Sequence, residues 1–419
     1  MRRLKESGSD PNFLRRVVVG LTPIFCVISL VPLPVLGQLP PSVTLEEVLR
    51  IVSESPRVVA SQREAEAARA EREAAGAFAN PSLSVGRSRP AGGDRTIFDA
   101  RSQDQASAEL PVPIFGQRAA RVRVAERQIE RADFQLLQTV NETRKIAALG
   151  FVRLLTAQEQ LALRQRARGE IERIRGIVSG RMDSGMASRY DLARADAELS
   201  LSTIGEQRAE AETAEHAAAI AALAGATQWR PRAEGTLELP WRTEGDLQEL
   251  INGNPALQTA RAETRAAEAR IELAQRERFP VPSLGVARTW THSPFGAANF
   301  LGVTSEIPIL DTRRAQEDKA RAEAGAARAR ERSLEVGLRA ELQRHLEALR
   351  VRRAAMGKLQ ERQDSFLDMA ESAYRLGRAT LFELLDARRT QVEAADARLE
   401  LLGAIAESEI ELRALAGAL

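Results

Sequence analysis

The sequence predicts a mainly α-helical protein with a membrane β-barrel part, in which one unit of long coiled-coil helices and a β-hairpin occurs twice. Three observations support this prediction. Short motifs recur in the same order about 190–200 residues apart. The composition is typical of long helices, and short segments alternate polar and apolar residues with the period of a β-strand.

The composition indicates helical rods rather than a compact globular core. Aromatic residues make up 4% of the 419 residues and charged residues 28%. Much of the remainder is Ala, Leu, Arg and Glu, a pattern typical of coiled coils. The formal net charge of +2 creates no strong field for nucleic acid, so no nucleic acid is expected among the partners.

Residues 1–37 have the features of a secretory signal peptide. Arg15 and Arg16 close a basic segment, residues 17–36 are uncharged and mostly apolar, and Gly37 is a small residue at a plausible cleavage point. A membrane anchor is the alternative, since the run is long enough to span a bilayer. Three prolines interrupt the run, which favours a cleaved signal.

No constellation typical of an enzyme or a cofactor site is visible. Cys26 is the only cysteine and lies in the signal segment, so the mature chain is expected to have no disulfide or thiol chemistry. His216, His292 and His345 are scattered, with no i,i+3 or i,i+4 partner, and their spacing indicates no metal site. We therefore expect no enzyme activity and no cofactor.

Five pairs of motifs, in the same order in both halves, indicate the duplication. The pairs are SPRVVASQREAEAARA from Ser55 with NPALQTARAETRAAEA from Asn254, NPSLSVG at 80–86 with FPVPSLGV at 279–286, PIFGQR at 113–118 with PILDTR at 308–313, GMASRYDL at 185–192 with GRATLFEL at 377–384, and ALAGA at 222–226 with ALAGA at 414–418. We expect a first repeat at 38–229, a linker rich in turn formers at 230–243 and a second repeat at 244–419.

Each repeat is expected to contain one β-hairpin. Alternation of polar and apolar residues predicts strands at about 82–89 and 104–111 in the first repeat. The same period predicts strands at about 283–291 and 300–307 in the second repeat. The chain is thus expected to have four strands, each with one apolar face.

A long helix is expected after each hairpin. No proline occurs from Gly116 to Asp183, and small or apolar residues recur at steps of three and four, which is typical of a coiled-coil seam. This predicts a helix at 116–183 that is about 100 Å long, and its counterpart at 312–376. The seam consists of Ala125, Ile129, Ala132, Leu136, Thr139, Thr143, Ala147, Gly150, Leu154, Ala157 and Leu161.

Each long helix is expected to end in a tight turn. Gly185 and Gly377 suit the left-handed residue that closes a helix. Ser188 and Thr380 each precede an acidic residue by three positions, a spacing that predicts a capping box at the start of a new helix. The return helices are expected at about 188–225 and 380–416.

Four strands cannot close a barrel that leaves a lumen, since that takes eight or more. Open sheet edges are not tolerated in lipid, so membrane strands would require several chains to share one barrel. The alternating faces, the signal peptide and Trp290 near a strand end agree with an outer-membrane barrel.

The stretches TLEEVLRIVSESP, NPSLSVG, PVPIFGQR, GMASRYDLARADAEL and GRATLFELLDARRTQVEA are spread over both repeats. On these residues the whole mature chain resembles the TolC family of outer-membrane efflux proteins. The resemblance implies a homotrimer in outer-membrane lipid, with a twelve-stranded β-barrel continued by a periplasmic α-helical barrel. It also implies a passive exit duct that docks a periplasmic adaptor and an inner-membrane pump.

The resemblance further implies that the helix turns face the adaptor. The adaptor-contacting residues would be Ser184, Gly185, Met186, Leu376, Gly377 and Arg378. The family often has Val-Gly-Thr or Val-Gly-Leu at these turns. Here the glycines match and their neighbours differ, which leaves the choice of adaptor open.

Some members of that family line the periplasmic entrance with two acidic residues just past the second turn. The matching positions are Glu383 and Asp386, which lie three apart and therefore face one side of a helix. A threefold ring of carboxylates there would attract cations. Two simpler roles stay open, since Glu383 is the capping-box acid and Asp386 can be a solvated acid favoured by the helix dipole.

Arg118 and Arg313 follow the second strand of each hairpin, in the first turns expected for the long helices. The helix dipole does not favour a cation at that position. We therefore expect both arginines to bind acidic partners at the membrane boundary.

The competing class is a soluble periplasmic coiled-coil adaptor or scaffold. An adaptor would have one helical hairpin flanked by β-rich domains, whereas this sequence predicts two helical hairpins and two strand pairs in tandem. The end of the sequence soon after LAGAL is similar to the branch of the family that serves heavy-metal exporters. Export of drugs or proteins stays open.

Overall fold

The computed structural model describes residues 39–89, 102–239, 247–291, 296–360 and 366–419. Every element described here belongs to one compact unit, Pro41–Leu419. The predicted signal peptide at 1–37 lies outside the described residues.

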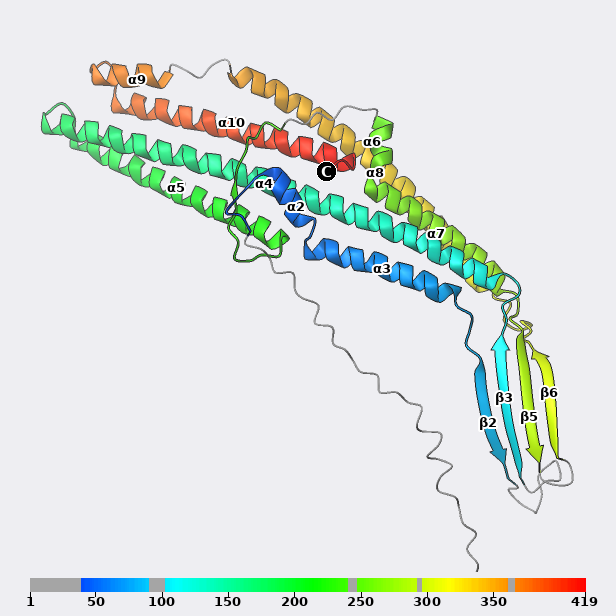
Figure 1. Ribbon diagram of the computed structural model, residues 1–419. Helices are drawn as coiled ribbons and strands as arrows, with labels where there is room; N and C mark the ends of the chain where they lie inside the picture. Colours follow the sequence, from blue (N-terminus) through cyan, green and yellow to red (C-terminus); the bar gives the residue numbers. More distant parts are fainter. Residues whose placement is uncertain (1–38, 90–101, 240–246, 292–295, 361–365) are drawn as a thin grey trace, which may run out of the picture. The chain divides into compact units, whose positions relative to one another are not determined.

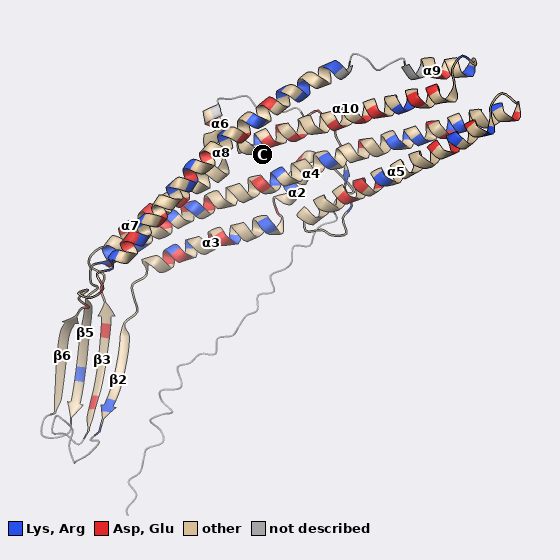
Figure 2. Ribbon diagram, turned by 180° about the vertical axis from the view of Figure 1, so that it is seen from behind, with Lys and Arg blue, Asp and Glu red and all other residues tan. Residues whose placement is uncertain are grey.

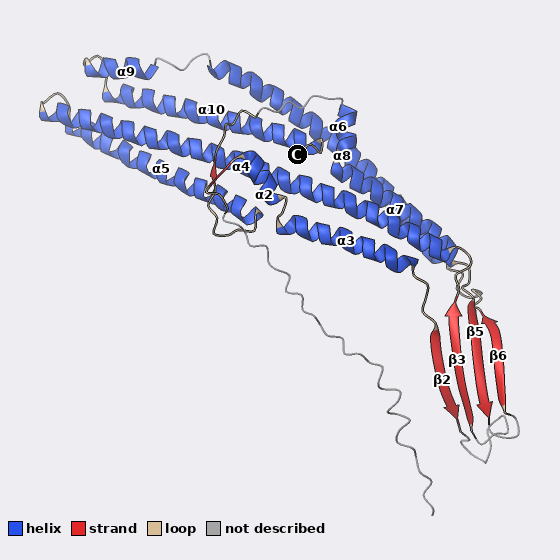
Figure 3. Cartoon of the chain, in the orientation of Figure 1, coloured by secondary structure: helices blue, strands red, loops and turns tan. Residues whose placement is uncertain are grey.

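The same order of elements occurs twice along the chain (Figures 1 and 3). The first half contains α2 (Leu45–Val52), α3 (Pro56–Gly76), β2 (Ser82–Ser88), β3 (Gln103–Pro111), α4 (Gln117–Asp183) and α5 (Arg189–Leu223). The second half contains α6 (Leu247–Gly253), α7 (Pro255–Glu277), β5 (Ser283–Thr291), β6 (Ala297–Thr304), α8 (Arg314–Gln360), α9 (Phe366–Arg375) and α10 (Leu381–Leu415).

The strand β6 differs from its expected position at about 300–307. It begins and ends three residues earlier, because Thr304 pairs with Ser283 at the start of β5. The residue before Ser283 is Pro282, which has no N–H to extend the ladder. The helix expected at 312–376 is described as α8 and α9, and residues 361–365 between them are outside the described part.

Two short strands were not expected. β1 (Ser42–Val43) and β4 (Arg232–Ala233) pair in parallel, so the described residues hold six strands rather than four. β4 lies in the segment expected to be a linker, and its ends are fixed by backbone bonds from Arg232 to Pro41 and from Glu234 to Val43, both 2.9 Å. Two-residue strands carry no periodic signal, so only tertiary pairing reveals them.

The four longer strands form one antiparallel sheet in the order β2-β3-β5-β6. Its register puts most of the apolar side chains on one face and mainly small and polar residues on the other, which confirms the predicted alternation; Phe300 is an exception on the second face. One row on the apolar face consists of Leu83, Ala108, Val286 and Leu301, and the adjacent row on the opposite face consists of Ser82, Glu109, Gly285 and Gly302. Charged residues are sparse on these strands and frequent on the helices (Figure 2).

The helix α4 has 67 residues and is therefore about 100 Å long. It packs along α3, α5, α7 and α10, and every residue of the predicted seam is buried or half-buried. Phe151, Val152 and Leu155 are also buried although they lie outside the seam, because α4 has neighbours on more than one side. By length and composition alone α4 could cross a membrane, a property that packed core helices share.

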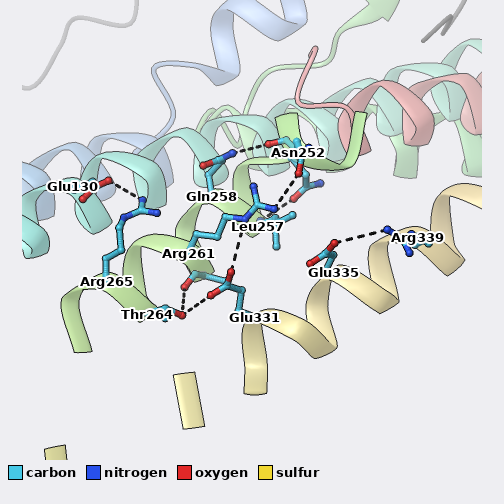
Figure 4. Close-up of polar contacts among 12 residues, drawn as sticks. Glu130, Asn252, Leu257, Gln258, Arg261, Thr264, Arg265, Glu331, Glu335 and Arg339 are labelled. Carbon is cyan, nitrogen blue, oxygen red and sulfur yellow. Dashed lines mark hydrogen bonds and ion pairs between the residues drawn. The ribbon is translucent and has the colours of Figure 1, made fainter. Parts of the chain in front are cut away.

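Polar contacts join α7 to the helices on both sides of it (Figure 4). Arg265 donates from a terminal guanidinium nitrogen to Glu130 Oε1 of α4 at 2.7 Å, and Thr264 Oγ1 donates to Glu331 Oε2 of α8 at 2.7 Å. Asn254 caps α7 by accepting from Leu257 N at 3.1 Å. The second half is thus fixed to the first along α4.

The last carbonyls of α10 accept hydrogen bonds from distant asparagines. Asn141 Nδ2 of α4 donates to Ala414 O at 2.9 Å, and Asn254 Nδ2 donates to Leu415 O at 2.9 Å. Helix ends leave such carbonyls without intrahelical partners. The C-terminal end of α10 is therefore closed by side chains from both halves of the chain.

The two strand-to-helix junctions use their arginines in the same way. Arg118 Nε donates to Gly76 O at 2.7 Å, and an Arg313 guanidinium nitrogen donates to Glu277 O at 2.8 Å. These carbonyls end α3 and α7, where the helix dipole favours a cation. Their partners in this chain are thus carbonyls, not the acidic groups expected. Arg313 also precedes α8, with φ 53°, so its expected place in the first turn is wrong.

Candidate functional site at the helix turns

The two helix turns have the same backbone conformation. Gly185 follows α4 with φ 73°, and Gly377 follows α9 with φ 70°. Met186 N donates to Arg181 O at 2.7 Å, and Arg378 N donates to Ala373 O at 2.8 Å. In both turns a left-handed glycine lets the chain reverse while the last carbonyls of the helix stay hydrogen-bonded.

Capping boxes start both return helices, as the three-residue spacing predicts. Ser188 Oγ accepts from Asp191 N at 3.1 Å, and the Asp191 carboxylate accepts from Ser188 N at 2.9 Å. Thr380 and Glu383 make the same exchange at 3.3 and 2.7 Å. The hydrogen bonds from Thr380, first from its backbone and then from its hydroxyl, lower the pKa of Glu383. Those from Ser188 lower the pKa of Asp191.

Both turns rest on one hydrophobic cluster, which we call the turn cluster. It consists of Ile171, Ile174 and Val178 of α4, Tyr374 of α9, and Leu381, Leu384 and Leu385 of α10. Arg181 adds a polar link, since its guanidinium donates to Tyr374 O at 2.8 Å and lies 4.8 Å from the centre of that ring. The end of α4 and the start of α10 are therefore held together within one chain.

The six residues expected to contact an adaptor are all exposed: Ser184, Gly185, Met186, Leu376, Gly377 and Arg378. Met186 is 65% exposed and Leu376 is 70% exposed. Tyr190 and Phe382, just past the turns, are also exposed. Large apolar side chains gathered on a surface are typical of protein contact sites.

The two acidic residues of the expected gate lie on the exposed side of α10, away from buried Leu384 and Leu385. Glu383 Oε2 accepts both capping hydrogen bonds from Thr380, at 2.7 and 3.0 Å, so its capping role is confirmed. Asp386 has no hydrogen bond or ion pair among the described residues. One chain therefore presents one carboxylate held in a cap and one that is free.

A second group of side chains was missed by sequence reasoning. Glu341 and His345 of α8 and Glu411 of α10 bring three ligand atoms within 4.8 Å of one another, the one such group among the described residues. The prediction that histidine spacing indicates no metal site overlooked Glu341, four positions before His345. That spacing was a visible signal, but Glu411 joins the group only through the packing of α10 on α8.

Comparison with known proteins identifies the family. Residues 50–226 and 247–418 match the family model described as outer membrane efflux protein. The nickel-cobalt-cadmium resistance protein NccC of Alcaligenes xylosoxydans xylosoxydans is 29% identical over 311 residues, which cover 70% of this chain and 67% of NccC. The cobalt-zinc-cadmium resistance protein CzcC of Cupriavidus metallidurans is 26% identical over 324 residues, which cover 73% of this chain and 76% of CzcC.

The fold is also found in solved structures. The outer-membrane channel OprN superimposes with a TM-score of 0.77 at 20% identity, covering 89% of this chain and 90% of OprN. The alternative of a soluble periplasmic adaptor finds no support, since two helical hairpins are present and both halves match the efflux family. The chain therefore belongs to the outer membrane efflux protein family, and it is an outer-membrane exit duct of tripartite efflux systems.

Proposed function

We propose that three copies of this chain form a duct that releases divalent heavy-metal cations. The cations are delivered by an inner-membrane pump through a periplasmic adaptor. We choose this substrate because both relatives are named for metal resistance. NccC is named for nickel, cobalt and cadmium, and CzcC for cobalt, zinc and cadmium. Each match spans at least two thirds of both chains.

The sheet supports assembly from several copies. β2 and β6 are its edge strands, and each carries apolar side chains that are more than 60% exposed, such as Leu83 and Leu301. A four-stranded sheet cannot close on itself, and lipid does not tolerate open edges. Three copies would join β2 of one chain to β6 of the next and give a barrel of about twelve strands.

The helix turns support docking at the other end of α4. The exposed Met186 and Leu376 offer apolar contacts, and Arg378 offers a charge that the first turn lacks. In a threefold assembly the carboxylates of Glu383 and Asp386 would line the entrance. A ring of carboxylates at a constriction concentrates cations and binds those that block the pore.

The substrate is tested by susceptibility measurements in a strain that has lost this duct but retains its pump and adaptor. Restoring the wild-type gene should raise tolerance to zinc, cobalt, nickel or cadmium several-fold and leave tolerance to organic drugs unchanged. A gain confined to organic drugs would overturn the choice of substrate.

The entrance is tested by single-channel recording. The double variant E383A/D386A should weaken block by multivalent cations. The matched control is Asp191→Ala, which removes the corresponding capping acid of the first turn and should leave block unchanged. Unaltered block in E383A/D386A would remove both residues from this role.

A further inference from the structure

We propose that Glu341, His345 and Glu411 form a binding site for one divalent transition-metal cation of the zinc class, within a single chain. The three side chains come from two adjacent helices, α8 and α10, and their ligand atoms lie within 4.8 Å of one another. His345 Nε2 is 3.9 Å from Glu341 Oε1. The site is distinct from the helix turns, and it stands whether or not the exported substrate is a metal.

The separations require only a small closure around an ion. Three ligand atoms no more than 4.8 Å apart lie within about 2.8 Å of a common centre, and zinc binds nitrogen and carboxylate oxygen at about 2.0–2.2 Å. Each ligand atom would move inward by at most about 0.8 Å. Rotation of the three side chains covers such a distance without any helix movement.

The two helices that carry the ligands, α8 and α10, are packed against each other beside the site. Leu342 and Leu349 of α8 and Leu412 of α10 belong to one buried hydrophobic cluster. Glu409 of α10 is buried and pairs with Arg353 of α8 at 2.7 Å. Because these neighbours flank the ligands, the site is built on packed helices rather than on loops, which favours a defined coordination geometry.

The imidazole is largely shielded from solvent, since the side chain of His345 is 16% exposed. Such burial restricts rotation of the ring and keeps its Nε2 near the two carboxylates.

Two cationic side chains contact the groups that would bind the metal ion. Lys145 Nζ of α4 lies 3.4 Å from Glu411 Oε2. Arg344 approaches Glu341 Oε1 at 3.6 Å and His345 Nε2 at 3.2 Å. One divalent ion carries the same charge as these two groups together, so exchange leaves the net charge of the cluster unchanged. Both side chains are partly exposed and can turn into solvent.

The ligand set selects the class of cation. One imidazole and two carboxylates suit Zn²⁺, Co²⁺ and Ni²⁺, whereas Cu(I) prefers thiolates and Ca²⁺ takes six or more oxygens. Three protein ligands leave a fourth position of a tetrahedral ion for water. The site therefore resembles an open zinc site rather than a closed structural one.

The test uses the full mature protein, purified in detergent without a histidine tag and stripped of metal with a chelator. Zinc chloride is titrated by calorimetry, and cobalt chloride by its visible absorption. We expect one ion per chain, and at least tenfold weaker binding in His345→Gln and in Glu411→Gln. The matched control is His216→Gln, since Glu212 stands four residues before His216 but no third ligand joins them among the described residues; it should bind as wild type.

Variants of the two cations separate metal binding from general damage to the structure. Lys145→Met and Arg344→Gln remove the competing charges, so each should tighten zinc binding several-fold, which a damaged fold would not do. Equal affinity in wild type and His345→Gln, or no tightening in Lys145→Met, would overturn the proposal. Metal susceptibility of cells does not enter this test, so its outcome and that of the proposed function are independent.

Discussion

Two helix turns can be compared, the first at 184–187 and the second at 376–379. They have the same backbone conformation and differ in the side chains that they expose. Their glycines have φ 73° and 70°. The residue after the glycine is apolar in the first turn (Met186) and cationic in the second (Arg378). The same geometry thus recurs where the chain must reverse, while the surface offered to a partner differs.

A partner that docks on both turns therefore meets two chemically different surfaces within one chain. In a trimer these surfaces would alternate around the entrance. The likeness of the two turns lies in buried contacts and backbone conformation, and their difference lies in exposed side chains. Substitutions can separate these two contributions.

The largest effect is expected from the turn cluster that both turns share. Ile174→Ala in α4 and Leu384→Ala in α10 should each lower the free energy of unfolding by about 2–5 kcal/mol. Because both side chains belong to one cluster, the double variant should lose less than the sum, by about 0.5–3 kcal/mol. Denaturant unfolding of the detergent-purified protein measures this.

The control for that coupling is Leu154→Ala, which empties a fully buried position of α4 outside the turn cluster. The free energy of unfolding lost in Leu154→Ala should add to that lost in Leu384→Ala. Additive losses for Ile174→Ala and Leu384→Ala would mean that the two turns are packed independently.

The glycines test whether the two backbones are equivalent. Gly185→Ala and Gly377→Ala should each lower the free energy of unfolding by about 1–2 kcal/mol, since an L-residue is strained in the left-handed region. A methyl group at either position would meet no atom within 4 Å, so the loss has no steric part. Unequal losses would break the comparison.

A helical glycine provides the control for those variants. Gly180 of α4 also has open space around it but has no positive φ. Gly180→Ala should raise stability by up to about 1 kcal/mol, because alanine favours the helix. A loss at Gly180 similar to that at Gly185 would rule out backbone strain as the cause.

The capping boxes should have smaller and similar effects in both turns. Ser188→Ala should cost about 1 kcal/mol, and Thr380→Ala a similar amount. Because folding lowers the pKa of Asp191 and of Glu383, their stabilisation is present above the unfolded pKa of about 4. It is lost as the pH falls through the lower folded value. Hydrogen exchange of the first-turn amides at different pH values measures this loss.

The smallest effect is expected from the link between the turns. Arg181→Gln removes the cation over the Tyr374 ring and should cost about 0.5–1 kcal/mol. Tyr374→Phe keeps both the ring and the backbone carbonyl that Arg181 contacts, so it should be nearly neutral. An equal loss in Tyr374→Phe would show that the hydroxyl, not the ring, matters in this link.

Features that depend on nearby residues could be predicted from the sequence. The capping boxes need only a three-residue spacing, the faces of β5 and β6 a period of two, and the seam of α4 steps of three and four. Each signal lies within one element, so a single sequence contains it. The exposed tip residues could be located for the same reason, because glycine and the cap define the turn.

Contacts between distant residues could not be predicted in this way. The pairing of β4 with β1, the carbonyl partners of Arg118 and Arg313, and the approach of Glu411 to His345 each join separate elements. In each case one partner is an ordinary polar residue or a backbone group without a distinctive neighbourhood. Only the folded arrangement shows which of many such groups it meets.

The closure of α10 by Asn141 and Asn254 has a consequence for the order of folding. The bond from Asn141 to Ala414 spans 273 residues of chain, so it cannot form until residue 414 has been synthesised. Contacts of such long sequence separation close slowly, because the entropy of the intervening chain opposes them. Until then the apolar strand faces and the last carbonyls of α10 are exposed together, which makes the folding intermediate prone to aggregation.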